Sequence, residues 1–206
     1  MPKKRYYVIV PHCLLNPATR VHVLGHGFNL TQNLINYLLA KKIGIIQLPC
    51  PEFTAMGYWR NPQGRQQYDN IFFKKHCAKE LENIIDMIIE LNRNKHTLLC
   101  YFGIAGSPTC SIYWGKHKLN RYHTESIHAF DIPNEETESS DETKFGVMTE
   151  VLDTMLSNYQ IKIPYLEVPI KENLNSEAVA HFFAQLDTLL NIPPEFRTDY
   201  TKLTIE

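Results

Sequence analysis

The sequence predicts a three-layer α/β fold, in which a mostly parallel sheet carries helices on both of its faces. Two observations lead to this prediction. Short apolar runs typical of buried strands alternate along the chain with longer segments whose apolar residues recur at helical spacing. Parallel strands need such crossover segments between them, and helical crossovers cover both faces of the sheet. The chain has 206 residues, which is enough for one domain, so we expect residues 1–206 to form a single α/β domain.

The first part of the chain is expected to form a strand, a helix and a second strand. Residues 6–10 (YYVIV) are apolar and β-rich, as in a strand that is buried on both faces, and Pro11 ends them. Leucines spaced four apart over residues 30–38 predict a helix. Residues 43–48 (IGIIQL) predict the second buried strand, which Pro49 ends.

The middle of the chain is expected to hold a long loop, a long helix and a third strand. Residues 53–68 contain two glycines and a proline, which predict a loop, and a loop of that length in a compact domain is usually functional. Residues 69–91 keep apolar side chains at helical spacing and predict a helix. Residues 97–102 (TLLCYF) predict a strand, which the glycines of GIAGSPTCS end.

The last part of the chain is expected to begin with a mobile acidic loop inside the domain, over residues 134–143. Residues 147–156 then predict a short helix. Residues 161–168 (IKIPYLEV) predict a fourth strand, which Pro164 places near an edge of the sheet. A last helix is expected over residues 176–190. This repeated order of strands and helices favours a Rossmann-like or flavodoxin-like architecture.

The composition argues against several classes of protein. Lys plus Arg number 21 and Asp plus Glu number 22, so the net charge of −1 offers no basic excess for binding duplex nucleic acid. No run of about 18 apolar residues is present, so we expect no membrane span. The start of the chain is typical of a first strand rather than of a signal peptide. The five cysteines are odd in number and widely spaced, which argues against a disulfide scaffold and favours a reducing compartment, so we expect a cytoplasmic protein.

Three of the five cysteines follow predicted strands. Cys13, Cys50 and Cys110 come after the first, second and third strand, and the carboxyl ends of neighbouring parallel strands meet at one rim of a sheet. Three thiolates at one rim suit zinc with one water, or a 4Fe-4S cluster with one iron that has no protein ligand. The alternative is that they are small packed hydrophobic residues, because free cysteine is often buried. We favour that alternative for Cys77, on a helical stripe, and for Cys100, inside the third strand.

The motifs around these cysteines make the prediction more specific. CLLN begins at Cys13 and is followed by Arg20, CPE spans residues 50–52, and a GxxxSPTC motif ends on Cys110. In this order, each after a predicted strand, these motifs resemble those of the thiouracil desulfidase (TudS-like) family, most strongly over residues 6–115. The resemblance implies a 4Fe-4S cluster held by the three cysteines, whose open iron binds the sulfur of a thiolated pyrimidine and removes it without net redox change.

The resemblance also implies roles for two other residues. The family's active-site carboxylate falls on Glu52 and its active-site serine falls on Ser107, three residues before the last ligand. A carboxylate beside the cluster could take a proton from the attacking water and return one to the ring nitrogen, and the serine could hydrogen-bond the substrate. The alternatives are that Glu52 is a surface carboxylate that caps the following turn and that Ser107 is an ordinary turn residue. The chain departs from the family where TRVHVLGHG replaces RYDGG after the first cysteine.

Other side chains are weaker candidates for a site. His22 and His26 have the spacing of zinc ligands on a helix, but the neighbouring glycines argue against a helix, so we expect exposed loop histidines. Arg20, Arg60 and Arg65 could meet a substrate phosphate, although arginines on polar loops are usually solvated.

The sequence therefore predicts an oxygen-sensitive iron-sulfur enzyme that hydrolytically removes sulfur from a small thiolated compound, such as a thiouracil-type base or nucleotide. One alternative is a zinc-dependent hydrolase that uses the same thiolates. Another is a non-catalytic module in which the cluster or the pocket serves sensing or sulfur carriage. Nothing in the sequence marks an interface between copies of the chain, so it predicts no oligomeric state.

Overall fold

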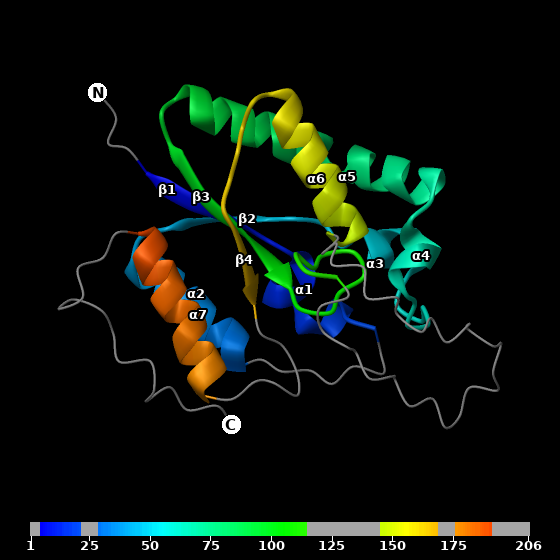
Figure 1. Ribbon diagram of the computed structural model, residues 1–206, viewed down its shortest axis with the longest axis horizontal. Coiled ribbons are helices and arrows are strands. Elements are labelled where there is room, and N and C mark those ends of the chain that lie inside the picture. Colours follow the sequence, from blue (N-terminus) through cyan, green and yellow to red (C-terminus); the bar gives the residue numbers. More distant parts are fainter. Residues whose placement is uncertain (1–4, 22–28, 115–144, 169–175, 191–206) are drawn as a thin grey trace.

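The computed structural model describes residues 5–21, 29–114, 145–168 and 176–190 (Figure 1). Four strands in these residues form one all-parallel sheet with the order β2-β1-β3-β4. In chain order the elements are β1 (Tyr6–Val10), α1 (His12–Leu15), η1 (Pro17–Thr19), α2 (Asn29–Ala40), β2 (Gly44–Gln47), α3 (Pro51–Met56), α4 (Arg65–Tyr68), α5 (Ile71–Arg93), β3 (Thr97–Ile104), α6 (Val147–Asn158), β4 (Tyr165–Val168) and α7 (Ser176–Leu189).

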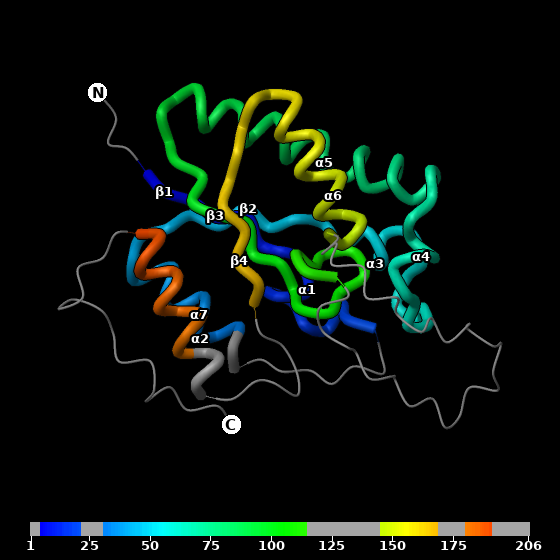
Figure 2. Tube along the Cα trace, viewed as in Figure 1, coloured from blue at the N-terminus to red at the C-terminus, as the bar shows by residue number. Residues whose placement is uncertain are grey.

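Helices cover both faces of the sheet, which confirms the three-layer α/β fold. Figure 1 shows α5 and α6 on one face and α2 and α7 on the other, and the tube in Figure 2 shows the same layers without the ribbon. On the second face, the Tyr37 hydroxyl of α2 donates to Asp187 Oδ1 of α7 at 2.7 Å. The Tyr37 and Phe183 rings also pack with centroids 5.1 Å apart. These contacts join two helices that are distant in the sequence.

The centre of the sheet is fully buried, as the run of apolar residues in β1 predicts. Val8, Ile9 and Val10 have no exposed surface, because β1 pairs with β2 and β3 along its two edges and helices cover both faces of the sheet. The strand order agrees with that of flavodoxin-like sheets, in which the chain changes direction across the sheet between β1 and β3. Ligands of such folds bind beyond the carboxyl ends of the strands at this switch point.

The prediction of a loop over residues 53–68 is wrong at both ends, because α3 and α4 are helical there. Pro51 occupies the first turn of α3, where its missing N–H has no helical partner to lose. Gly57 ends this helix with a φ of 76°, a left-handed conformation that glycine adopts without strain. Two short helices therefore border the region that the sequence predicts as irregular.

Smaller differences concern the later strands. β3 continues to Ile104, two residues beyond its predicted end, whereas β4 begins at Tyr165 and not at residue 161. Pro164 has no N–H to donate, and its carbonyl accepts from the Tyr101 N–H at 3.0 Å. β4 lies at an edge of the sheet, as predicted. The predicted acidic loop of residues 134–143 lies outside the described residues, and none of the described helices is long and apolar enough to cross a membrane.

Candidate functional site

The three strand-end cysteines follow three adjacent strands of the sheet. Cys13 lies in α1 directly after β1, so it is on a short helix and not on the expected loop. Cys50 follows β2 and is the residue before α3, and Cys110 lies in the turn after β3. Because β2, β1 and β3 are neighbours and run parallel, all three cysteines come to the carboxyl edge of the sheet.

The thiols of these cysteines influence one another electrostatically. Burial raises the pKa of the Cys13 thiol to about 12, and Cys50 also raises it, whereas Arg20 lowers it. Burial raises the pKa of Cys110 well above its usual value, and Cys13 and Cys50 contribute in the same direction. Such effects weaken with distance, so the three sulfur atoms lie within electrostatic reach of one another. All three are free thiols.

A single metal ion makes a stricter demand on its ligands than a cluster does. A zinc ion bonded at about 2.3 Å needs all of its ligands around one centre, whereas each thiolate of a 4Fe-4S cluster binds a different iron. In the parts of the chain that the structure describes, no three His, Cys, Asp or Glu side chains form a group that could hold one ion. His22 and His26 lie outside the described residues.

The remaining two cysteines belong to the core. Cys77 on α5 and Cys100 in β3 have no exposed surface and pack in the main apolar cluster, as the sequence predicts. Burial raises the pKa of each of these thiols to about 12. Both are therefore small buried side chains in the folded protein.

Ser107 shapes the turn that carries the last cysteine. Its hydroxyl oxygen accepts from the Cys110 N–H at 3.0 Å and from the Thr109 N–H at 3.4 Å. The Cys110 carbonyl accepts from the Ile104 N–H at 2.9 Å and from the Tyr101 hydroxyl at 3.2 Å. Ser107 is thus a turn residue that orders the backbone around the third thiol. Its hydroxyl proton takes no part in these two bonds and is free to be donated to another group.

The start of α6 supports the same turn from the other side. The Gly146 N–H donates to the Ser111 carbonyl at 2.9 Å, and the Val147 N–H donates to the Pro108 carbonyl at 3.1 Å. A Cβ on Gly146 would lie 2.8 Å from the Cys110 nitrogen, so only glycine allows this approach. Sequence reasoning missed this support, because the two segments are far apart in the chain and no local pattern links them.

Glu52 is a buried carboxylate with two hydrogen-bond donors. It is 7% exposed, which excludes the reading of Glu52 as a surface residue that caps a turn. Arg60 Nε lies 3.2 Å from its Oε2, and the Thr109 hydroxyl donates to its Oε1 at 2.6 Å. Arg60 is held in turn by the carbonyls of Thr19, at 2.8 Å, and Gly57, at 3.1 Å. The carboxylate is therefore paired and fixed in orientation.

A chain of hydroxyl groups joins the two residues that the family motifs single out. The Ser107 and Thr109 hydroxyl oxygens lie 3.3 Å apart, and the Thr109 hydroxyl donates its one proton to a hydrogen bond with Glu52. Because a hydroxyl has only one proton to donate, Ser107 is the donor in its contact with Thr109. Thr109 Oγ1 also lies 3.5 Å from Cys110 Sγ. Ser107, Thr109 and Glu52 thus form one hydrogen-bonded series beside the third thiol.

Two arginines are buried and ion-paired, so the expectation of solvated arginines is wrong for them. Arg60 is 6% exposed and Arg65 is 8% exposed. Arg65 forms ion pairs with Asp69 and Glu150, and its Nε donates to the Phe145 carbonyl at 2.7 Å. Through these bonds to Glu150 and Phe145, Arg65 joins α4 to the beginning of α6, the segment that supports the third cysteine.

Two buried side-chain atoms near the cysteines make no hydrogen bond to another described residue, and they are Arg20 Nε and Ser111 Oγ. Arg20 lowers the pKa of Cys13, and Ser111 directly follows the third cysteine. Each atom carries a proton, and buried donors are rarely left without an acceptor. These unpaired donors and the three thiols fit an anionic group that is rich in acceptors, as the sulfides of an iron-sulfur cluster are.

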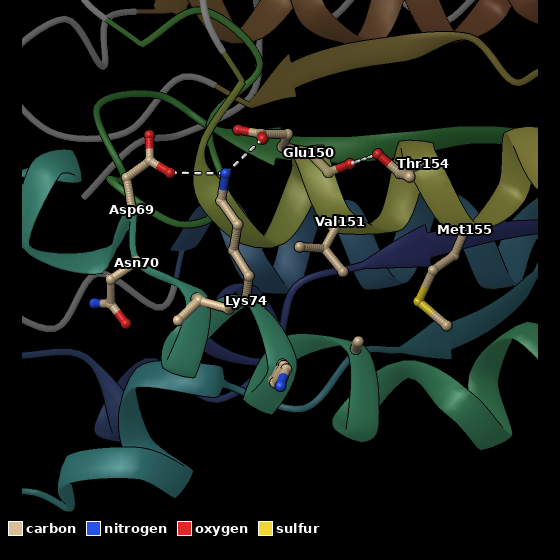
Figure 3. A pocket seen from close by; sticks show the side chains of 10 residues that line it. Asp69, Asn70, Lys74, Glu150, Val151, Thr154 and Met155 are labelled. Atoms are coloured by element: carbon tan, nitrogen blue, oxygen red, sulfur yellow. Dashed lines mark hydrogen bonds and ion pairs between the residues drawn. The ribbon is translucent and has the colours of Figure 1, made fainter.

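A cavity of about 570 Å³ lies elsewhere, between α5 and α6. Figure 3 shows the Lys74 ammonium between two carboxylates of its wall, at 2.7 Å from Asp69 and 2.8 Å from Glu150. The other lining residues are Asn70, Ile71, Lys75, Ala78, Val151, Thr154 and Met155. No cysteine lines this cavity and its central charges are paired, so it is separate from the site at the strand ends.

Comparisons with known proteins match the part of the chain that carries the cysteine motifs. The family described as "Putative 2-thiouracil desulfurase" matches residues 6–142. The uncharacterized protein MJ0003 of Methanocaldococcus jannaschii is 32% identical over 111 residues, which are 54% of this chain and 70% of that protein. No solved structure matches the chain. The matched segment contains Cys13, Cys50 and Cys110 and ends before α6.

Proposed function

The chain belongs to the 2-thiouracil desulfurase family, and we propose that it hydrolytically removes sulfur from a small thiolated compound, such as a thiouracil-type base or nucleotide. The arrival of three cysteines at the ends of three adjacent parallel strands, beside a buried carboxylate, carries this proposal. Sulfur ligands at a strand-end crevice suit a soft metal centre, and the fold binds ligands at that edge.

The proposed cofactor is a 4Fe-4S cluster held by Cys13, Cys50 and Cys110, with one iron left without a protein ligand. The mutual electrostatic effects of the three thiols and the unpaired donors around them support this assignment. A bound cluster would supply a Lewis-acidic iron for the soft sulfur of the substrate. Free thiols and such a cluster persist best in a reducing compartment, so we place the protein in the cytoplasm.

Glu52 is proposed as the general base and acid of the hydrolysis. Arg60 and Thr109 hold its carboxylate in one orientation. The carboxylate is therefore already positioned to take a proton from water, and no conformational entropy is lost in orienting it during the reaction. Water supplies the oxygen of the product, the sulfur leaves as hydrogen sulfide, and no electron is transferred. Ser107 is proposed as the second catalytic residue, because its hydroxyl connects through Thr109 to Glu52.

Anaerobic purification tests the cofactor. The wild-type protein should be brown and hold about four iron and four sulfide per chain. Serine substitutions of Cys13, Cys50 or Cys110 should each abolish iron binding, whereas Cys77→Ala and Cys100→Ala, in the core, should retain it. Protein that binds zinc and no iron under these conditions would support the zinc hydrolase instead.

Release of sulfide from 2-thiouracil tests the activity. Glu52→Gln should leave the visible spectrum of the cluster intact while sulfide release falls by about 100-fold or more. The spectrum is the control, because it shows that the variant folds and binds iron. Wild-type protein with a full cluster and no sulfide release from any thiolated base or nucleotide would favour a non-catalytic sensing or sulfur-carrying module.

A further inference from the structure

Glu167, in the edge strand β4, holds the backbone that follows the third cysteine. Its Oε1 accepts from the Ile112 N–H at 3.2 Å and from the Tyr113 N–H at 3.3 Å. Both donors come shortly after Cys110 in the chain, but they lie 55 and 54 positions before Glu167. Figure 1 shows the carboxyl end of β4 beside that of β3. The fourth strand therefore contributes a side chain to the rim that holds the cysteines, although it carries no cysteine itself.

The packing of Ile112 places these bonds against the sheet. Gly103 of β3 pairs with Glu167 of β4 in the register of the two strands. A Cβ on Gly103 would lie 2.4 Å from Ile112 Cγ1, so the buried Ile112 side chain fills the space that the glycine leaves open. Gly103 is also the first residue of the GxxxSPTC motif. This glycine therefore allows the chain after Cys110 to return over β3 and to reach the neighbouring strand.

The turn of Cys110 is thus held on both sides of the cysteine. On one side, the Ser107 hydroxyl accepts from the Cys110 N–H at 3.0 Å, and the Ile104 N–H donates to the Cys110 carbonyl at 2.9 Å. On the other side, Glu167 holds the next two backbone N–H groups but one. Cys110 is only 6% exposed, so movement of the backbone that follows it would open its thiol to solvent.

We propose that Glu167 is a positioning residue of the site, which fixes the place of the Cys110 thiol through the N–H groups of Ile112 and Tyr113. The inference rests on the proposed function and adds to it how the third ligand is held before any iron binds. A ligand whose place is set in advance loses less conformational entropy on binding, so a fixed Cys110 favours assembly of the cluster. Glu167 lies outside residues 6–142, the segment that matches the family.

Alkylation of the thiols in the full-length, iron-free protein tests the inference. Iodoacetamide labels a buried thiol when its surroundings open, and mass spectrometry of the peptides gives the rate for each cysteine separately. Glu167→Ala removes the acceptor, so we expect Cys110 to be labelled about 10-fold faster than in the wild type, as for the loss of a hydrogen bond to a carboxylate. Glu167→Gln keeps an oxygen that accepts from both N–H groups, so it should retain the wild-type rate.

Cys77 and Cys100 are internal controls, because they have no exposed surface and become labelled only when the chain unfolds more widely. In Glu167→Ala their rates should rise less than that of Cys110. Tyr37→Phe is the matched control for stability, since its lost hydrogen bond lies between α2 and α7 on the second face of the sheet. This variant should not raise the rate of Cys110 by a larger factor than the rates of Cys77 and Cys100.

Three results would overturn the inference. The first is a wild-type labelling rate of Cys110 in Glu167→Ala. The second is a rise by the same factor for Cys110, Cys77 and Cys100, which would mean that Glu167 only stabilises the whole fold. The third is an equal rise in Glu167→Gln, because an acceptor at this position would then not hold the turn. If Glu167→Ala does not fold, Glu167→Asp replaces it, since its carboxylate is one carbon shorter, and it should also speed the labelling of Cys110.

Retention of iron measures the consequence for the loaded protein. After anaerobic reconstitution, a ferrous chelator should remove iron from Glu167→Ala about 10-fold faster than from the wild type, whereas Glu167→Gln should keep the wild-type rate. Wild-type protein that takes up no iron and releases no sulfide would refute the proposed function, and the labelling of Cys110 would still decide whether Glu167 holds its turn. A wild type that releases sulfide, together with unchanged labelling and iron retention in Glu167→Ala, would overturn the inference alone.

Discussion

Thr109 donates a hydrogen bond to Glu52 Oε1 at 2.6 Å, and this bond joins residues 57 positions apart. Thr109 precedes Cys110 after β3, and Glu52 follows Cys50 after β2. These two strands are not neighbours, because β1 lies between them. The bond therefore spans the central strand and sets the carboxylate in a defined relation to two of the three thiols.

Replacing Thr109 by valine should weaken both the site and the fold. The valine keeps the shape of the side chain but leaves a buried carboxylate short of one donor. The free energy of unfolding should fall by about 1.5–3 kcal/mol, the range for a hydrogen bond to a charged group. Urea denaturation measures this loss. Thr154→Val is the control, since Thr154 donates only to the Glu150 carbonyl of its own helix at an exposed position, and it should change stability by less than about 0.5 kcal/mol. Equal stabilities of the two variants would contradict the importance of the bond.

Gly146→Ala should displace the turn of the third cysteine. The new Cβ would lie 2.5 Å from the Thr109 carbonyl carbon and 2.8 Å from the Cys110 nitrogen, so backbone must move. We expect the free energy of unfolding to fall by about 1–3 kcal/mol and iron binding after anaerobic reconstitution to decrease. Gly44→Ala on β2 is the control, because its Cβ would meet the Tyr7 Cβ at an ordinary 3.4 Å. Full iron content in Gly146→Ala would show that α6 does not position Cys110.

The ion pairs of Asp69, which follows α4 directly, with Arg65 and Lys74 should stabilise the protein in a defined pH range. Hydrogen bonding from Lys74 lowers the pKa of Asp69 below its usual value, and Arg65 acts in the same direction. A lowered folded-state pKa contributes stability above the unfolded pKa of about 4, and this contribution is lost as the pH falls through the folded pKa. Asp69→Asn should therefore lower the thermal midpoint at pH 7, by an amount that corresponds to at most about 1 kcal/mol for such exposed pairs.

The same comparison near pH 3 should show a smaller difference between Asp69→Asn and the wild type, because the wild-type carboxyl is then becoming protonated. Asp86→Asn, at an exposed position of α5, provides the control and should have little effect at either pH. A difference for Asp69→Asn that stays constant from pH 7 to pH 3 would rule out its charge as the cause.

The bond between Tyr37 and Asp187 should hold α2 and α7 together on the second face of the sheet. Tyr37→Phe removes a donor 2.7 Å from a carboxylate with no exposed surface. We expect the free energy of unfolding to fall by about 1–3 kcal/mol, measured by urea denaturation. Tyr159→Phe, at a residue that is 56% exposed, should have almost no effect. Iron content should be unchanged in both, since neither residue lies at the strand ends.

Local patterns were sufficient to predict most of the fold. A run such as YYVIV becomes a buried strand because β-branched and aromatic residues fill both faces of a sheet, and β1 is found at residues 6–10 as predicted. The helical spacing over residues 69–91 likewise predicts α5 to within two residues at each end. The prediction of a loop over residues 53–68 was wrong at both ends, because α3 and α4 are too short to show a helical period in the sequence.

The candidate site could likewise be predicted only in part. Cys13, Cys50 and Cys110 could be singled out because each follows a strand, and adjacent parallel strands end at one rim. The partners of Glu52, which are Arg60 and Thr109, could not be predicted, because they depend on which side chains other segments bring beside it.

The order of strands and helices, the cysteines at the strand ends and the family motifs could all be read from the amino-acid sequence, because they depend on residues close together in the chain. The pairing of Glu52 with Arg60 and the support of the third cysteine by the start of α6 became visible only in the folded chain. Hydrogen bonds and burial between distant segments depend on how the helices pack on the sheet, and no periodic pattern along the chain records that packing.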